Sequence, residues 1–291
     1  MRPLALLVRR NIKLYFSDRT SVFFSLLGAL IAVFIVLLFM KSSILDTMVA
    51  SYQGLVDRAT CDDLLNCWIV ASAAVIASAT TGLGAMRQYV ADRESGRWRD
   101  FLISPVTPAT LTLGYLLAAT IVSVIMTTIV YLLGTVYCLV GGATLELARV
   151  VEAWGWIMLC SVSFTALMGF VTSLLTTVAS YAGISTVIGV LFGFLSETYV
   201  QAGALSTHVT DVLNSLPFAQ ATALVRGAYL DDGIAALPAD VHDPTRATMG
   251  IDLTVGSTVL PTWLIIAVLA GCAVVFTVLA SVSIGRAVKG H

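Results

Sequence analysis

The sequence predicts an all-α integral membrane protein with six transmembrane helices, because three of its features argue against a soluble fold. Only 11% of the 291 residues are charged and 58% are hydrophobic, whereas a soluble domain carries about 25% charged residues. Several apolar runs reach the roughly 20 residues that a helix needs to cross a bilayer. These runs leave no room for a soluble catalytic domain, so we expect a single transmembrane domain over residues 1–291.

Residues 1–18 are expected to form an amphipathic helix at the membrane surface. At about 100° per residue, the apolar side chains gather on one side and the basic ones on the other. The apolar side holds Leu4, Leu7, Val8, Ile12, Leu14 and Tyr15, and the basic side holds Arg2, Arg9, Arg10 and Lys13. Such a helix either only anchors the chain and sets its topology, or also presents a surface to a cytoplasmic partner.

Six apolar segments are expected to span the membrane, at residues 20–41, 66–86, 109–140, 153–178, 183–203 and 259–284. The first apolar run is too long for the core of a secretion signal and no small-residue cleavage site follows it, so we expect a retained span. The spans carry almost no charge, which argues against an ion-coupled transporter or a proton pump. Lys41 and Glu197 lie near span ends, where they can reach water.

The charge distribution predicts which side of the membrane each loop occupies. Of the 16 basic residues, 11 lie in the termini and in segment 87–108, together with only four of the 17 acidic residues. Lys and Arg near span ends favour the cytoplasm, so we expect both termini on the cytoplasmic side of the plasma membrane. The net charge of −1 argues against nucleic acid as a partner, since binding a polyanion requires a basic surface.

Residues 87–108, between the second and third spans, are expected to form a shaped cytoplasmic elbow. The second span should continue as a helix through "MRQYVADRES" and break at Gly96, because glycine inside a helix costs about 1 kcal/mol. Thr107 can cap the next helix, with Pro108 at its first position. An ordinary basic loop would explain the arginines, but aromatic residues beside arginine also favour a protein interface. The elbow would display Arg97, Trp98, Arg99 and Phe101.

Residues 204–258, on the outer side, are expected to contain short helices that re-enter the membrane before the sixth span. The stretch 209–230 is half apolar but too short and too interrupted to span. Pro217 suits the first turn of a helix, so two short helices would meet there, packed against protein. Residues 231–252 are rich in turn residues, which predicts a solvated loop.

The sequence carries no pattern of catalytic or metal-binding residues. Cys61 and Cys67 flank "DDLL" in an expected polar loop, where they form either a local disulfide or two free thiols. The three histidines are scattered over loops and the C-terminus, and no zinc-type spacing is present. No G-x-x-x-x-G-K-[ST] phosphate loop occurs, so ATP is not expected to bind this chain by that route.

The segment "DRESGRWRDFLISPVTPATLTLGYLL" (92–117) resembles the signature of ABC-2 type permeases, the membrane subunits of ABC exporters. That signature has the form E-R-E-x-G-T-x-E-x-L-L-x-S-P. The residues that keep the pattern are Asp92, Arg93, Glu94, Gly96, Leu102, Ser104 and Pro105. Arg97 stands where threonine is usual, and Arg99 lies near the expected second acid. The outer stretch 215–230 is similar to the family's segment before the last span, through Pro217 and Arg226.

The resemblance implies an assembly of several subunits. Two permeases, the same or homologous, would pair, and each would dock one ABC ATPase subunit on its elbow and N-terminal helix. The ATPase would hold ATP and Mg²⁺, so this chain itself would carry no cofactor. The residues that would contact the ATPase are Arg9, Arg10, Lys13, Arg93, Glu94, Gly96, Arg97, Trp98, Arg99 and Phe101.

The function that the resemblance implies is export of a hydrophobic or amphipathic substrate, such as a drug, a peptide or a lipid, as in multidrug efflux. The substrate would leave along the interface of the permease dimer, lined by spans one, two and five. The same architecture also exports polysaccharides and glycolipids. Two readings outside transport stay open, a membrane-embedded enzyme that modifies lipids and a sensor that binds a ligand with residues 204–258.

Overall fold

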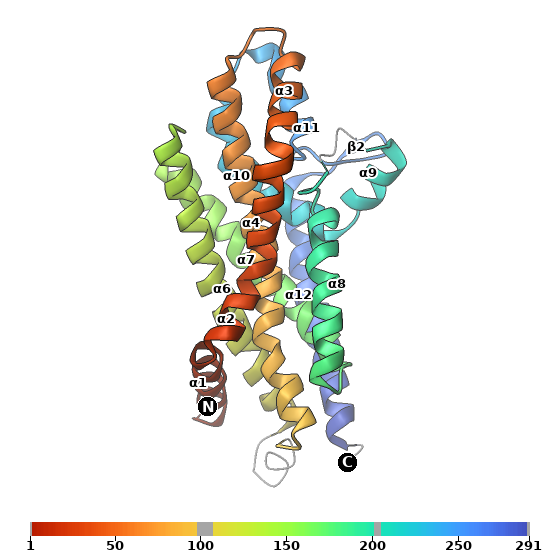
Figure 1. Ribbon diagram of the computed structural model, residues 1–291. Coiled ribbons are helices and arrows are strands. Elements are labelled where there is room, and N and C mark those ends of the chain that lie inside the picture. Colours follow the sequence, from red (N-terminus) through yellow and green to blue (C-terminus); the bar gives the residue numbers. More distant parts are fainter. Residues whose placement is uncertain (1, 98–106, 201–204, 290–291) are drawn as a thin grey trace.

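Helices form most of the chain in a computed structural model, which describes residues 2–97, 107–200 and 205–289. Figure 1 shows an elongated bundle with α1 and the end of α12 at one end and α9, α11 and β2 at the other. We call these the inner end and the outer end. Within the described residues, six helices are long and apolar enough to cross a membrane, which confirms the predicted fold class.

The first part of the chain supplies a surface helix and the first long helix. α1 (Arg2–Ser17) is followed by α2 (Arg19–Ile35), the π-helical turn η1 (Val36–Met40) and α3 (Lys41–Ser51), which continue one another. In α1, Leu7 and Tyr15 are buried and Arg9 and Lys13 are exposed, as the amphipathic pattern predicts. Arg10 departs from the expected basic face because it reaches a buried carboxylate.

The other long helices are α4 (Arg58–Glu94), α6 (Pro108–Gly141), α7 (Leu147–Ser173), α8 (Val178–Leu195) and α12 (Thr262–Lys289). α4 lies at the centre and packs against α2, α6, α7 and α8, so most of its side chains are buried. Small residues permit this close packing. A Cβ atom on Gly82 would lie 2.5 Å from Thr165 Oγ1, and one on Gly134 would lie 2.5 Å from Val70 Cγ1.

Local sequence signals explain where α6 begins and ends. Thr107 Oγ1 accepts a hydrogen bond from the Thr110 N–H at 3.2 Å and Pro108 occupies the first turn, as predicted. At the other end Gly142 adopts a left-handed φ of 114°. The Ala143 N–H then donates to the Cys138 carbonyl at 3.1 Å, which satisfies one of the last carbonyls of the helix.

Short elements cover the outer end. They are α9 (Thr207–Asn214), α10 (Pro217–Ala235), the 3₁₀ helix η3 (Ala239–Val241), α11 (His242–Thr248), and the antiparallel pair β1 (Thr254–Val255) and β2 (Thr258–Val259). Pro217 begins α10, as predicted. The prediction of a solvated loop at 231–252 is wrong, because α10 continues into this segment and Met249 and Ile251 are buried. Apolar residues placed between the turn residues explain this packing.

The prediction of an outer loop between the first two spans, at residues 42–65, is also wrong. α3 and α4 extend into it and leave only a short turn at residues 52–57. Hydropathy falls where charged residues begin, but both helices continue beyond that point because buried residues such as Leu45 and Leu64 pack in the core. Ion pairs also join the two helices there. Lys41 Nζ lies 2.9 Å from Asp62 and Arg58 lies 2.7 Å from Asp46, so Lys41 meets a carboxylate near the predicted span end.

The local disulfide proposed for Cys61 and Cys67 does not form in this structure. Both residues lie in α4 rather than in a loop, and both are buried free thiols. Six residues along a helix correspond to a rise of about 9 Å, which exceeds the Cα separation that a disulfide allows. The alternative of two free thiols is therefore correct.

Candidate functional site

A buried carboxylate at the inner end joins three helices. Asp92, in the last turn of α4, has no exposed surface. Arg10 of α1 donates to its two oxygens at 2.8 and 3.1 Å. Tyr115 of α6 donates through its hydroxyl at 2.7 Å, and Gln88 donates through Nε2 at 2.7 Å. A buried charge is stable only when it is paired and hydrogen-bonded, and these contacts meet that requirement.

Arg10 is held in its charged form by this cluster. Burial alone would lower the pKa of the Arg10 guanidinium. Its hydrogen bonds to Asp92 and the charge of that carboxylate outweigh burial, so the pKa is raised above its ordinary value. Arg10 therefore stays charged at any physiological pH, and its two bonds to Asp92 fix α1 against the end of α4.

The next two residues of α4 bind the turn between α7 and α8. Arg93 donates through Nη1 to the carbonyls of Ser173 and Leu175, both at 3.0 Å. Glu94 Oε2 accepts from the N–H of Val178 at 3.1 Å. A cation thus lies at the C-terminus of α7 and an anion at the N-terminus of α8, which is the favourable arrangement for both helix dipoles.

The chain leaves α4 through a bend at Gly96. This glycine has a left-handed φ of 74°, and no atom lies within 4 Å of the place where a Cβ would be. It ends the helix where the sequence predicts a break. Arg97 follows with 62% of its side chain exposed and Nη1 3.7 Å from Asp92 Oδ1. Trp98, Arg99, Phe101, Leu102, Ser104 and Pro105 lie outside the described residues.

The structure divides the predicted contact residues into two groups. Arg10, Arg93 and Glu94 are hydrogen-bonded within the chain. Arg9, Lys13, Gly96 and Arg97 are exposed, and of these Arg97 also lies 3.7 Å from Asp92. The predicted site did not include Gln88, Tyr115 or the α7–α8 turn, which are also parts of this cluster. The four-residue spacing of Gln88 and Asp92 was an available signal. The others come from distant parts of the chain, and the sequence contained no signal for them.

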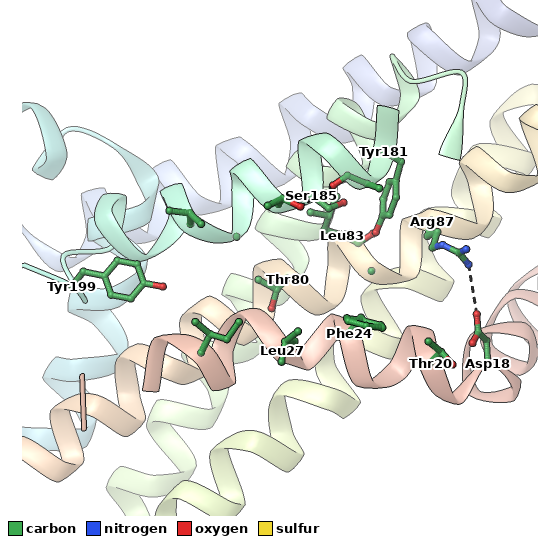
Figure 2. A pocket seen from close by; sticks show the side chains of 16 residues that line it. Asp18, Thr20, Phe24, Leu27, Thr80, Leu83, Arg87, Tyr181, Ser185 and Tyr199 are labelled. Carbon is green, nitrogen blue, oxygen red and sulfur yellow. Dashed lines mark hydrogen bonds and ion pairs between the residues drawn. The ribbon is translucent and has the colours of Figure 1, made fainter. Parts of the chain in front are cut away.

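A groove between α2, α4 and α8 is the second candidate site. Its volume is about 580 Å³. Figure 2 shows the Asp18–Arg87 ion pair, 3.5 Å apart, at one end of the lining and Tyr199 at the other. Most of the lining is apolar, as in Phe24 and Leu83. A few hydroxyl groups interrupt it, including those of Thr80, Ser185 and Thr186.

Arg226 organises the outer end. It is buried and lies 4.4 Å above the ring of Trp68 in α4. Its guanidinium donates to Ser72 Oγ at 3.0 Å, to the Met249 carbonyl at 3.1 Å and to the Glu197 carbonyl at 3.1 Å. One side chain of α10 therefore joins α4, the end of α8 and the end of α11.

Glu197 does not reach water as predicted, because it is buried beside Arg226. Only 1% of it is exposed, and its φ of 53° is left-handed. Burial raises the pKa of the Glu197 carboxyl, and the charge of Arg226 opposes this shift. Burial lowers the pKa of Arg226 to about 9, against the opposing effect of Glu197. No local pattern in the sequence could predict this pair, since 29 residues separate its members.

Among the residues that the structure describes, six helices of membrane length and a polar cluster at the inner end of α4 define a multi-pass membrane protein. The chain belongs to the ABC-2 type transporter family, because the model of that family matches residues 3–228. No curated protein matches the chain. Members of this family are the membrane component, or permease, of ABC transporters, and the family implies association with an ABC ATPase and with the membrane.

Proposed function

We propose that the chain is the permease subunit of an ATP-driven exporter and forms one transmembrane domain in the plasma membrane, with both termini in the cytoplasm. The observation that carries this proposal is the triplet Asp92, Arg93 and Glu94. Its three side chains bind α1 and α6, the end of α7 and the start of α8, respectively. A force applied to the elbow would therefore move four helices together.

The ATPase would dock on the elbow. Arg97 is exposed and lies directly after Gly96, where α4 has ended. Trp98, Arg99 and Phe101 are proposed to complete the contact, as aromatic residues and arginine are favoured in interfaces. Arg10, Arg93 and Glu94 would transmit the movement to the bundle rather than touch the ATPase, because their polar groups are already bonded.

The substrate would occupy the groove between α2, α4 and α8. A volume of about 580 Å³ lies within the range of small-molecule sites, and an apolar lining with a few hydroxyl groups suits a hydrophobic or amphipathic molecule. We propose that a second permease covers the open side of the groove. Large exposed side chains of α2, such as Phe24 at 61% and Phe34 at 59%, supply the apolar surface for this pairing.

Reconstitution with the ATPase tests the proposal. The chain is co-expressed with a candidate ABC ATPase from the same genome. Transport of a fluorescent amphipathic dye into proteoliposomes is then followed with ATP and with a non-hydrolysable analogue. Gly96→Pro and Trp98→Ala should lower substrate-stimulated ATP turnover while the amount of protein in the membrane is unchanged. Unchanged turnover in both variants would contradict the coupling role of the elbow. ATP-dependent transport of a polysaccharide or glycolipid instead of the dye would replace the proposed substrate class.

A further inference from the structure

A second groove lies between α1 and α6 at the inner end of the bundle. Its volume is about 730 Å³. Its apolar floor comes from Leu4, Val8 and Ile12 of α1, which follow one another at four-residue spacing, and from Leu117 of α6. Two basic residues of α1, Arg9 and Lys13, flank this floor one helical turn apart.

Arg9 and Lys13 differ from Arg10 in the surroundings of their side chains. Arg10 lies on the opposite flank of the buried stripe of α1, which contains Leu7, Asn11 and Tyr15, and it reaches Asp92. Arg9 and Lys13 are exposed, and neither side chain forms an ion pair or a hydrogen bond with any residue that the structure describes. The groove thus pairs an apolar floor with two unneutralised positive charges.

The outer wall of the groove belongs to the lipid-facing surface of α6. Leu113, Leu117, Ile121, Ile125 and Ile129 are 39–44% exposed and repeat every four residues along this helix, so they form one apolar stripe. Leu117 is nine residues into the helix, about 14 Å from its start. A groove that opens onto such a stripe faces hydrocarbon, and a soluble ATPase would have to enter the bilayer to fill it.

We propose that this groove binds one anionic phospholipid from the leaflet that contains α1. An acyl chain would lie along Val8, Ile12 and Leu117, and the phosphate would lie between Arg9 and Lys13. An anionic phospholipid carries a negative charge for the two basic residues and an acyl chain for the apolar floor. Its headgroup and its acyl chains meet at the membrane depth where a surface helix lies. This inference does not depend on the proposed export function.

Native mass spectrometry of the delipidated full-length protein, titrated with phosphatidylglycerol or phosphatidylcholine, tests the proposal. Wild-type protein should bind one phosphatidylglycerol more tightly than phosphatidylcholine. In R9Q/K13Q the affinity for phosphatidylglycerol should fall about thirtyfold, since each basic residue near an anionic surface contributes about fivefold. Affinity for phosphatidylcholine should change little. The matched control R19Q/R286Q removes the same charge from the same end but away from the groove lining, and should leave both affinities unchanged.

A groove-filling variant separates lipid binding from a general loss of structure. Ala5 lines the groove and is exposed, so Ala5→Trp should weaken binding of both lipids while Arg9 and Lys13 remain. R9K/K13R, which keeps both charges, should bind phosphatidylglycerol like the wild type. Unchanged phosphatidylglycerol affinity in R9Q/K13Q overturns the proposal. If R9Q/K13Q loses ATPase binding but keeps its phosphatidylglycerol affinity, Arg9 and Lys13 belong to the interface with the ATPase instead.

Discussion

Asp92 depends on its partners more than any other described acid of the inner end, because it has no contact with water. Asp92→Asn should lower the free energy of unfolding by about 2–3 kcal/mol, since it leaves the half-buried charge of Arg10 without a carboxylate. The matched control is Asp46→Asn, which breaks an exposed ion pair with Arg58 and should cost less than about 1 kcal/mol. Unfolding in a graded detergent mixture measures both values. Equal losses would contradict the role assigned to the cluster.

Glu197 should make stability depend on pH. Its folded pKa is raised above the value of 4.5 that applies to an unperturbed carboxyl. Between these two pKa values the folded state binds more protons than the unfolded state, so stability is full at low pH and falls as pH rises through this window. Melting temperatures from pH 4 to pH 8 should show this fall in the wild type and a smaller fall in Glu197→Gln. The same pH dependence in both proteins would show that another group is responsible.

At the residue scale, the sequence identified important positions but not always their partners. Asp92, Arg93 and Glu94 were singled out through the resemblance, and Arg226 through its outer motif. Their bonds could not be predicted, because Arg10 lies 82 residues from Asp92 and the acceptors of Arg93 are backbone carbonyls. A carbonyl carries no sequence signature, so only the fold reveals such a contact.

The Gly96 bend should matter for function more than for stability. Gly96→Ala forces a side chain into a left-handed backbone, at a cost of about 1 kcal/mol. Gly54→Ala is a matched control at the outer end, because Gly54 has a φ of 84° and equally open surroundings. Both variants should lose similar stability, but only Gly96→Ala should lower ATP turnover by the reconstituted complex. A similar fall in turnover for both would show that strain alone is the cause.

α8 offers a position from which the groove between α2, α4 and α8, the proposed substrate site, can be filled. Gly189 lines the groove, and no atom lies within 4 Å of its missing Cβ. Gly189→Leu should therefore reduce dye transport severalfold while ATPase binding is retained. Gly183→Leu is the control, since Gly183 is equally open but lies outside the groove lining. Equal transport by the two variants would argue against this groove as the substrate path.

At the element scale, the sequence predicted what kind of element forms better than where it ends. The six long helices, the cap at Thr107 and the break at Gly96 follow from apolar run length and from local backbone chemistry. The ends of α3 and α4 were missed because hydropathy reports the membrane core, whereas these helices continue beyond it. Packing of buried residues such as Leu45 and Leu64 stabilises that continuation, and such packing depends on the tertiary fold.

For the whole molecule, pairing of two permeases across α2 can be tested by cross-linking. Phe34→Cys and Phe39→Cys replace side chains that are 59% and 73% exposed. Tested one at a time with Cys272→Ser, at least one should form a disulfide-linked dimer in membranes. Leu133 of α6 is 67% exposed but does not line the groove, so Leu133→Cys should not cross-link. Cross-linking through Leu133→Cys alone would place the dimer interface on α6 instead of α2.

The length of α4 has a consequence for how information crosses the membrane. Its 37 residues make a rod about 55 Å long, which carries Asp92 near one end and passes Trp68 beneath Arg226 towards the other. A tilt of about 5° around its middle would displace each end by roughly 2 Å, in opposite directions. Coupling of this kind is reciprocal. If a ligand at the outer end stabilises one tilt and thereby changes the affinity for the ATPase by some factor, ATPase binding must change the affinity for that ligand by the same factor.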